Sequence, residues 1–373
     1  MRIKFLALTA ASVLVAGNAF AASAVSDSPA LANQLVSVSV TPVASTQTAG
    51  IIAGSIGGAL GGGITVIPPA SPGLAPIGGG GGTIAPAGGV GPQSTLSGNK
   101  TVAFFNSRAQ SGVAAGGKLK KAGAWVMGGY TTVDGKDVGG EFDGDVSNLV
   151  AGFDFMPKDN AVLGVSIAYE NVDVTTTFNT GTFKGKGYTL APYGGIVLKN
   201  GVAIDGMIGV SKINYDTTRT NRTITGSFDA TRYMGSVNVS KAIKTSKLTL
   251  TPKAGIMQVR EKQDGYTDSS GVASASSTIN LGRASLGGTV AVNAGKFSPY
   301  VRAMAEYDYK KGKAADLGNG RTSSNDKFGI NAAVGVNAAI NDKLSINVEG
   351  SSSANMRDNL DVYGVTGRIR YNF

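Results

Sequence analysis

Cysteine and histidine are both absent from the 373 residues. Without histidine, a Ser-His-Asp triad, a histidine general base and a His-ligated metal site are excluded. Without cysteine there is no disulfide and no thiolate metal ligand. The composition therefore predicts no enzyme, no metal site and no cofactor.

Charged residues are missing from one long segment. Residues 28–99 contain no Asp, Glu, Lys or Arg, and residues 49–98 are dense in Gly, Ala, Pro and Ile, with five consecutive glycines at 78–82. Such a composition rarely builds a packed core. We therefore interpret residues 22–93 as a flexible or extended segment, too short and too rich in glycine to be a folded passenger domain.

Glycine also recurs every fourth residue in part of this segment, at Gly50, Gly54, Gly58 and Gly62. In a helix this spacing would align the glycines on one smooth face that permits close contact with another helix or a membrane. Each glycine, however, costs about 1 kcal/mol of helix propensity relative to alanine. The flexible interpretation is favoured, and we expect a helix of about three turns further on instead, within a linker over residues 94–120.

A hydrophobic run long enough to resemble a targeting signal occurs at the start of the chain. Arg2 and Lys4 precede an uncharged apolar stretch over residues 5–16, and small residues at Ala19 and Ala21 follow it. This is the pattern of a secretory signal peptide over residues 1–21, cleaved after Ala21. An exported chain that spans a membrane without hydrophobic helices must form a closed barrel, because lipid satisfies no backbone hydrogen bonds.

Strict alternation of side chains begins at about residue 121 and is clearest over the last thirteen residues. Apolar residues and glycine occupy the odd positions 363–373, whereas Arg368 and Arg370 occupy the other face. An arginine facing lipid near the midplane would cost roughly 2–4 kcal/mol, so the odd positions must face outward.

The connections between such segments give the strand count. Five short turns fall at residues 157–160, 199–201, 244–247, 295–296 and 341–343, and six longer polar segments fall at about residues 134–144, 179–182, 218–225, 262–277, 312–325 and 355–360. Eleven connections join twelve strands. We therefore predict an all-β fold, a 12-stranded antiparallel transmembrane β-barrel over residues 121–373. A soluble β-sandwich would need bulky inward residues, but the inward face is polar.

Charged residues of the inward face are expected to line the lumen. They are Arg232, Arg283, Arg302, Glu306, Glu349, Arg368 and Arg370. Asp308 lies two residues after Glu306 on the same face, an arrangement that favours a lumenal salt-bridge network over an acid–base pair. The net charge of +10 is dispersed along the chain, so we expect no nucleic-acid partner; outer-membrane lipids and lipopolysaccharide are the predicted partners.

Several short motifs resemble a known family. They are Gly123-Ala124-Trp125, Val150-Ala151-Gly152-Phe153-Asp154, Ala191-Pro192-Tyr193, Ser298-Pro299-Tyr300 and the terminal Arg370-Tyr371-Asn372-Phe373. Their order is similar to that of the autotransporter β-domain, the translocator of type V secretion. The resemblance implies a helix that plugs the pore, a passenger exported to the cell surface, and contact with periplasmic chaperones. It also implies that the barrel-assembly machinery reads Ile369, Tyr371 and Phe373.

Three functions follow as hypotheses. The first is an outer-membrane translocator that displays its own segment 22–93 at the cell surface, without the self-cleavage that some members perform at an Asn-Asn pair, which is absent here. The second is a porin-like channel with a basic lumen and no specific small-molecule substrate. The third is a structural outer-membrane protein.

Overall fold

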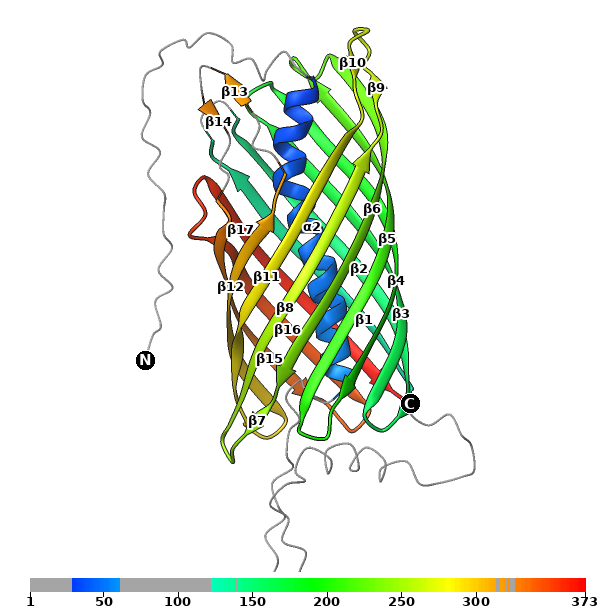
Figure 1. The fold of residues 1–373 in the computed structure, drawn as a ribbon, viewed down its shortest axis with the longest axis vertical. Coiled ribbons are helices and arrows are strands. Elements are labelled where there is room, and N and C mark those ends of the chain that lie inside the picture. The colour runs from blue at the N-terminus through cyan, green and yellow to red at the C-terminus, as the bar shows by residue number, and fades with distance from the viewer. Residues whose placement is uncertain (1–28, 61–121, 138–139, 313–315, 319–320, 323–325) are drawn as a thin grey trace, which may run out of the picture.

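A computed structural model of the chain describes residues 29–60, 122–137, 140–312, 316–318, 321–322 and 326–373. Within them, twelve long strands form one closed barrel (Figure 1). The strands are β1 (Ala122–Gly135), β2 (Phe142–Lys158), β3 (Ala161–Thr176), β4 (Gly181–Val197), β5 (Val202–Arg219), β6 (Ile224–Lys241), β8 (Leu248–Gln263), β11 (Ser277–Val292), β12 (Phe297–Lys310), β15 (Phe328–Ala339), β16 (Leu344–Asn355) and β17 (Leu360–Asn372). The predicted fold class is confirmed.

Every long strand pairs antiparallel with its neighbours in sequence, and β1 pairs with β17 to close the barrel. The remaining strands are short. β7 (Ile243–Lys244) extends one turn beside β8, and two small hairpins, β9–β10 (Tyr266–Thr267, Ala273–Ser274) and β13–β14 (Asp316–Gly318, Arg321–Thr322), lie within long connections.

The two ends of the barrel differ in the length of their connections. All five short turns lie at one end, which we call the turn end, together with the start of β1 and the C-terminus (Figure 1). The other six connections lie at the opposite end, the loop end, and include the two longest, residues 264–276 and 311–327. Because outer-membrane barrels place short turns in the periplasm, we expect the loop end to face the cell exterior.

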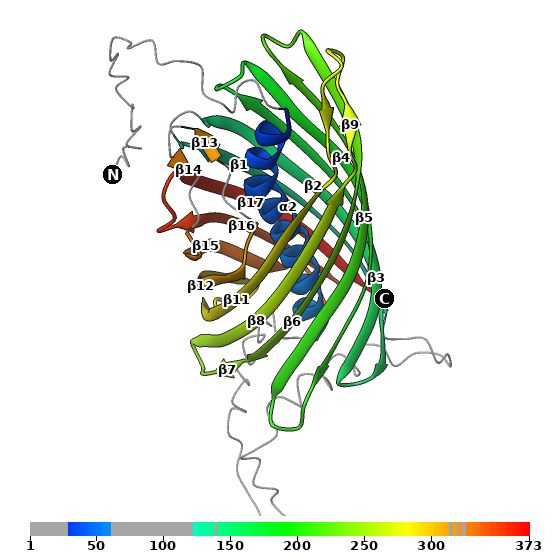
Figure 2. The same cartoon turned by 45° about the horizontal axis from the view of Figure 1, so that its top comes forward.

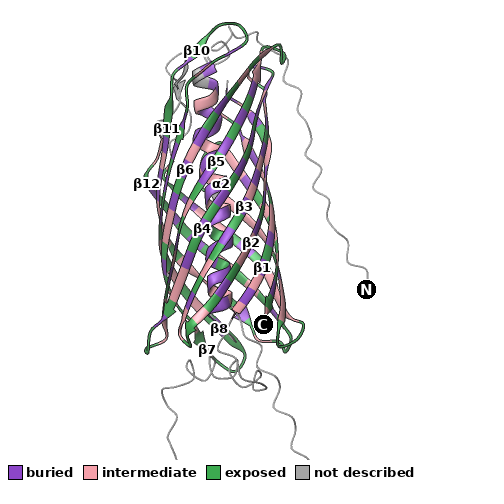
Figure 3. Ribbon diagram, turned by 90° about the vertical axis from the view of Figure 1, so that its right-hand side faces the viewer, coloured by how far each residue is buried: buried purple, intermediate pink, exposed green. Residues whose placement is uncertain are grey.

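Burial alternates along the strands as lipid outside and a polar lumen inside require (Figure 3). In β4, Phe183 is buried whereas Tyr188 is 70% exposed on the outer face. The wall is not equally tall all round. β5 and β6 have 18 residues each and β15 and β16 have 12, which at a strand tilt of roughly 45° corresponds to about 42 Å against about 28 Å. The taller side extends past a hydrocarbon core of about 30 Å.

The described helix, α2 (Pro29–Ala59), lies inside the barrel (Figures 1 and 2). This corrects the interpretation of residues 29–59 as part of a flexible segment. The sequence pattern misses the helix because its stabilisation comes from contacts with the barrel wall, which no local window reveals. The helix expected over residues 94–120 lies outside the described residues, as do the signal peptide and residues 61–93.

Candidate functional site: the barrel lumen

The direction of α2 is fixed by its contacts at both ends. Near its start, the Asn33 side chain donates a hydrogen bond to the Tyr266 hydroxyl (2.6 Å) in a hairpin at the loop end. Near its end, Leu60 lies against Gly195, close to the turn at residues 198–201. With 31 residues at about 1.5 Å each, α2 spans about 46 Å and runs the length of the lumen. Leu60 and Ala122 therefore both lie at the turn end, and Pro29 lies at the loop end.

One side of α2 is apolar and packs against the inner faces of β1–β6. Val36, Val40 and Ala44 share a buried cluster with aromatic residues near the loop end. Ile52 and Ile56 share a second cluster toward the turn end, and both are fully buried. Burying an isoleucine side chain contributes roughly 1.5–3 kcal/mol, so these contacts offset the poor helix propensity of the glycines.

A stripe of small hydroxyl residues on α2 is buried against the charged part of the wall. Its members are Ser37, Thr41, Ser45, Thr48 and Ser55. Thr41 donates a hydrogen bond to Glu261 (3.3 Å), and the Asn148 side chain donates to Thr48 (2.6 Å). The helix thus satisfies polar groups of the lumen without placing a charge of its own in it.

The charge network nearest to this stripe is centred on Arg232 of β6. Its guanidinium lies 2.7 Å from Glu261 of β8 and 2.7 Å from Glu170 of β3, and all three residues are at most 1% exposed. Tyr215 also donates a hydrogen bond to Glu261 (3.2 Å). The sequence indicated Arg232 as a lumenal residue but did not identify its two carboxylate partners.

A second network closes the opposite side of the lumen near the loop end. Arg283 contacts Asp308 (2.6 Å) and Glu306 (2.8 Å), and Arg357 also contacts Asp308 (2.6 Å). Both carboxylates are in ion pairs with arginines, but with Arg283 and Arg357 and not with Arg302, their neighbour on the same strand. Arg357 was not predicted, because it lies in a loop where no alternation indicates a direction. Lower on the same side, Arg302 contacts Glu349 (2.7 Å).

The two arginines of β17 have different surroundings. Arg370 forms two bonds to the buried Asp154 carboxylate, which also accepts a hydrogen bond from the Tyr193 hydroxyl (3.0 Å). Arg368 instead donates to the backbone carbonyl of Gly54 on α2. No carboxylate of the described residues lies within ion-pair distance of Arg368, and a Cβ at residue 58 would be in van der Waals contact with its guanidinium, at 3.4–3.6 Å.

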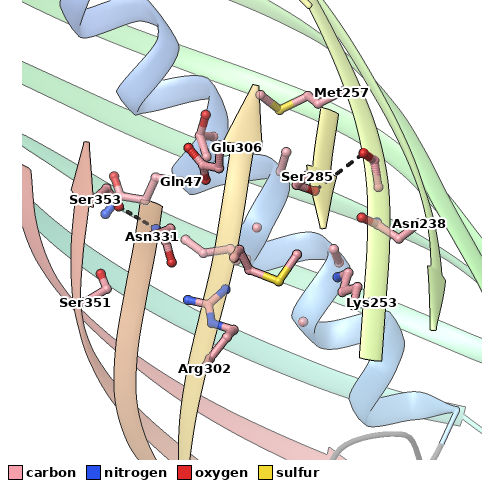
Figure 4. Close-up of a pocket in the computed structure, with 18 of the residues that line it drawn as sticks. Gln47, Asn238, Lys253, Met257, Ser285, Arg302, Glu306, Asn331, Ser351 and Ser353 are labelled. Carbon is pink, nitrogen blue, oxygen red and sulfur yellow. Dashed lines mark hydrogen bonds between the residues drawn. The ribbon is translucent and has the colours of Figure 1, made fainter. Parts of the chain in front are cut away.

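Gly50 and Gly57 of α2 face an open cavity, whereas Gly54 and Gly58 face the Arg368 guanidinium. The cavity is about 1090 Å³ and lies between the glycine-bearing side of α2 and the inner faces of β8, β11, β12 and β15–β17 (Figure 4). Its polar lining includes Lys253, Arg302 and Asn331. The lining reaches from Thr245 at the turn end to Asn359 at the loop end, so a passage remains alongside the helix.

The start of α2 is close to an ionised carboxylate in the loop-end hairpin. Asp268 lines the same small crevice as Pro29 and Ala32 and forms an ion pair with Arg219 (2.7 Å). Burial opposes its ionisation, but hydrogen bonds from Ser270, Arg219 and two backbone N–H groups outweigh burial and hold the pKa of Asp268 well below its usual range. A carboxylate that stays ionised near a helix N-terminus stabilises the helix, because it interacts with the positive end of the helix dipole.

The predicted assembly residues lie on the outer face of β17. Ile369, Tyr371 and Phe373 are exposed, and the Phe373 backbone N–H donates to the Ala122 carbonyl (3.0 Å) where the barrel closes. Phe373 also packs against Phe153 of β2. Their recognition by the assembly machinery stays a prediction.

Metal-binding chemistry has no support in the described part of the chain, where no group of three or more Asp and Glu side chains is arranged to hold an ion. The lumen instead combines an inserted uncharged helix, paired charges on the wall and a lengthwise passage. Such an arrangement suits the passage of a polypeptide or small solutes.

Comparisons with known proteins agree with this geometry. The sequence model of the family described as autotransporter beta-domain matches residues 124–351. Among solved structures, the translocator domain of autotransporter NalP from Neisseria meningitidis is similar with a TM-score of 0.57 and 13% identity, over 75% of this chain and 100% of that one.

Two further structures are comparable. The beta domain of the Bordetella autotransporter BrkA has a TM-score of 0.56 and 17% identity, over 68% of this chain and 99% of that one. The transport unit of AIDA-I from Escherichia coli has a TM-score of 0.56 and 14% identity, over 72% and 97%. No curated protein matches the chain in sequence. At these identities the structural likeness shows the fold.

Proposed function

Because the chain belongs to the autotransporter β-domain family, whose fold is an outer-membrane translocator barrel, we propose that it exports its own N-terminus and then plugs its lumen with α2. The observation that carries this proposal is the direction of α2. Pro29, the first described residue of the helix, lies at the loop end, which we assign to the cell exterior.

The same direction changes which residues we expect at the surface. Residues 29–60 occupy the lumen, and Leu60 and Ala122, the described residues on either side of the segment 61–121, both lie at the turn end. We therefore propose that the displayed part is the short stretch that follows the predicted signal cleavage site and precedes Pro29. The glycine-rich residues 61–93, which the sequence interpretation placed at the surface, are proposed to stay on the periplasmic side.

Epitope tags at two positions test this topology. One variant carries a tag between Asp27 and Ser28, and a second carries it at Gly80. On intact cells, antibody should label the first tag and should reach the second only after the outer membrane is permeabilised. Tags in the loop at 220–223 and in the turn at 198–201 provide the matched exterior and periplasmic controls.

Each result has a defined meaning. Labelling at Gly80 on intact cells, with the 198–201 tag still protected, would contradict the proposed topology. The glycine-rich segment would then be the displayed part. A protected tag at Asp27, with the 220–223 tag labelled, would mean that the N-terminus is not exported, in favour of a structural role.

The cavity alongside α2 supports a second candidate function, the slow diffusion of small solutes. The described lining includes the cations Lys253 and Arg368 and the carboxylate Asp205, none of which forms an ion pair with another described residue, so a small preference for anions would be expected. Currents across planar bilayers that contain the purified protein would measure this activity. Equal permeation of cations and anions would exclude selectivity for anions.

A further inference from the structure

Four cations gather on the outer wall of the tall side of the barrel. They are Lys186 of β4, Lys212 of β5 and Arg260 and Lys262 of β8, and we call them the basic patch. Lys212 pairs in register with Thr231 of β6, which pairs in turn with Lys262. Neighbouring strands are about 4.8 Å apart, so Lys212 and Lys262 are about 10 Å apart, with the Thr231 hydroxyl between them.

The patch lies directly above the apolar band of these strands. Val210 and Ile256 lie toward the turn end from Lys212 and Arg260 on the same outer face, Tyr233 is in register with Arg260, and all three apolar side chains are exposed. Tyr188, at 70% exposure, lies beside Lys186 on β4. Tyrosine rings mark the level of the lipid head groups. The patch is therefore at the head-group level, on the side of the membrane that faces the exterior.

The four charges are not neutralised by the protein. Among the described residues, no carboxylate lies within ion-pair distance of any of them, and Lys212 donates a hydrogen bond to the Thr231 hydroxyl (2.8 Å). Four carboxylates lie further up this wall. Asp173 pairs with Lys184 (2.9 Å) and Asp229 accepts a hydrogen bond from Asn214 (3.1 Å), whereas the exposed Asp216 and Asp264 lie outside ion-pair distance of the patch.

The feature is confined to one side of the barrel. Near the loop end, the outward residues of β12, β15 and β17 are the aromatic residues Tyr307, Tyr309, Phe328 and Tyr363. An aromatic belt therefore continues there, and its exposed cations, Lys310 and Lys327, lie only at the strand ends and not among the outward residues of the strands. A site on one side suits the binding of a discrete lipid molecule better than a general attraction to the surface.

We propose that the basic patch binds the phosphates of lipid A in the outer leaflet. Lysine and arginine are the residues that bind phosphate best, through charge-assisted hydrogen bonds. A lipid bound there would lay its acyl chains along the apolar wall below, beside Tyr233 and Ile256. The inference rests on the outer-membrane barrel alone and is independent of what the chain displays.

Native mass spectrometry of the purified full-length protein in detergent tests the site. The protein is titrated with bisphosphorylated lipid A and, separately, with the same lipid A after removal of its phosphates. The patch variant combines Lys212→Ala, Arg260→Ala and Lys262→Ala. The control variant removes three exposed lysines at or next to the turn end: Lys199→Ala, Lys241→Ala and Lys296→Ala.

We expect the affinity for bisphosphorylated lipid A to fall at least about tenfold in the patch variant and to change little in the control variant. Dephosphorylated lipid A should bind all proteins as weakly as the patch variant binds the intact lipid. A third variant, Lys212→Arg with Arg260→Lys and Lys262→Arg, should keep the affinity. Heat-modifiable migration in gels checks that every variant is folded.

Two outcomes would overturn the proposal. Equal loss of affinity in the patch and control variants would show that net charge, not this site, governs binding. Equal binding of phosphorylated and dephosphorylated lipid A to the unmodified protein would show that acyl chains alone determine the association.

Discussion

Two lumenal arginines differ in whether their removal would leave a buried carboxylate without a partner. Arg232 lies between Glu170 and Glu261, both almost fully buried, whereas Arg368 has no described carboxylate within ion-pair distance. Arg232→Met should therefore destabilise the barrel by about 3–5 kcal/mol, because two buried carboxylates lose their partner. The same substitution at Arg368 should cost about 1 kcal/mol, the loss of its hydrogen bond to Gly54.

Denaturant unfolding in lipid vesicles, followed by the fluorescence of Trp125, the single tryptophan, measures both values. Equal losses for the two variants would contradict the role of Arg232 as the neutraliser of two acids. A variant in which Glu170→Gln and Glu261→Gln accompany Arg232→Met should recover part of the stability, since no carboxylate is then left unpaired.

For single residues, alternation along a strand predicts whether a side chain points into the lumen or toward lipid, but not which residue it contacts. The inward positions of Arg283, Glu306 and Arg370 follow from the period of two, because lipid outside excludes charge. Which acid meets which base depends on strand register across the barrel, as for Arg232 and Glu261, which pair across β6 and β8. Arg357 has no such period to indicate its direction.

At the scale of the elements, the same Gly→Leu substitution should have different effects at two positions of α2. A Cβ atom at Gly58 would contact the Arg368 guanidinium at 3.4–3.6 Å, whereas a Cβ atom at Gly50 would have no neighbour within 4 Å. Gly58→Leu should displace Arg368 and loosen the helix. Gly50→Leu should be neutral or stabilising by up to about 1 kcal/mol, since leucine favours helix over glycine.

Protection of α2 from protease in the folded barrel measures this difference. Gly58→Leu should expose cleavage sites within residues 29–60, and Gly50→Leu should protect them at least as well as the unmodified chain does. If both variants are cleaved alike, the glycine spacing serves no contact with Arg368.

The elements also show why the sequence predicts the barrel better than its helix. A strand such as β17 has lipid on one face and water on the other, so its apolar and polar residues alternate. This period of two can be detected in a short stretch of sequence. The helix α2 has an apolar side, a hydroxyl stripe and a glycine side, none of them charged. Its helical state depends on the wall it packs against, so its composition alone favours the flexible interpretation.

For the whole molecule, the decisive property is how far α2 closes the pore. The helix fills a cylinder about 10 Å wide, and the passage beside it is about 1090 Å³ along the full length of the lumen. The intact protein should therefore give small single-channel currents in planar bilayers. Deletion of residues 29–60 should raise the conductance several-fold, because ionic current scales with the open cross-section.

The deletion needs a control of equal length, and the glycine-rich segment provides one in residues 62–93. That second deletion should leave the conductance unchanged if α2 is the plug, since its residues join Leu60 to β1 at the turn end. A rise caused by the control deletion alone would mean that the glycine-rich residues, and not α2, obstruct the pore. An equal rise in both variants would mean that neither segment alone closes it, and self-plugging by α2 would then be rejected.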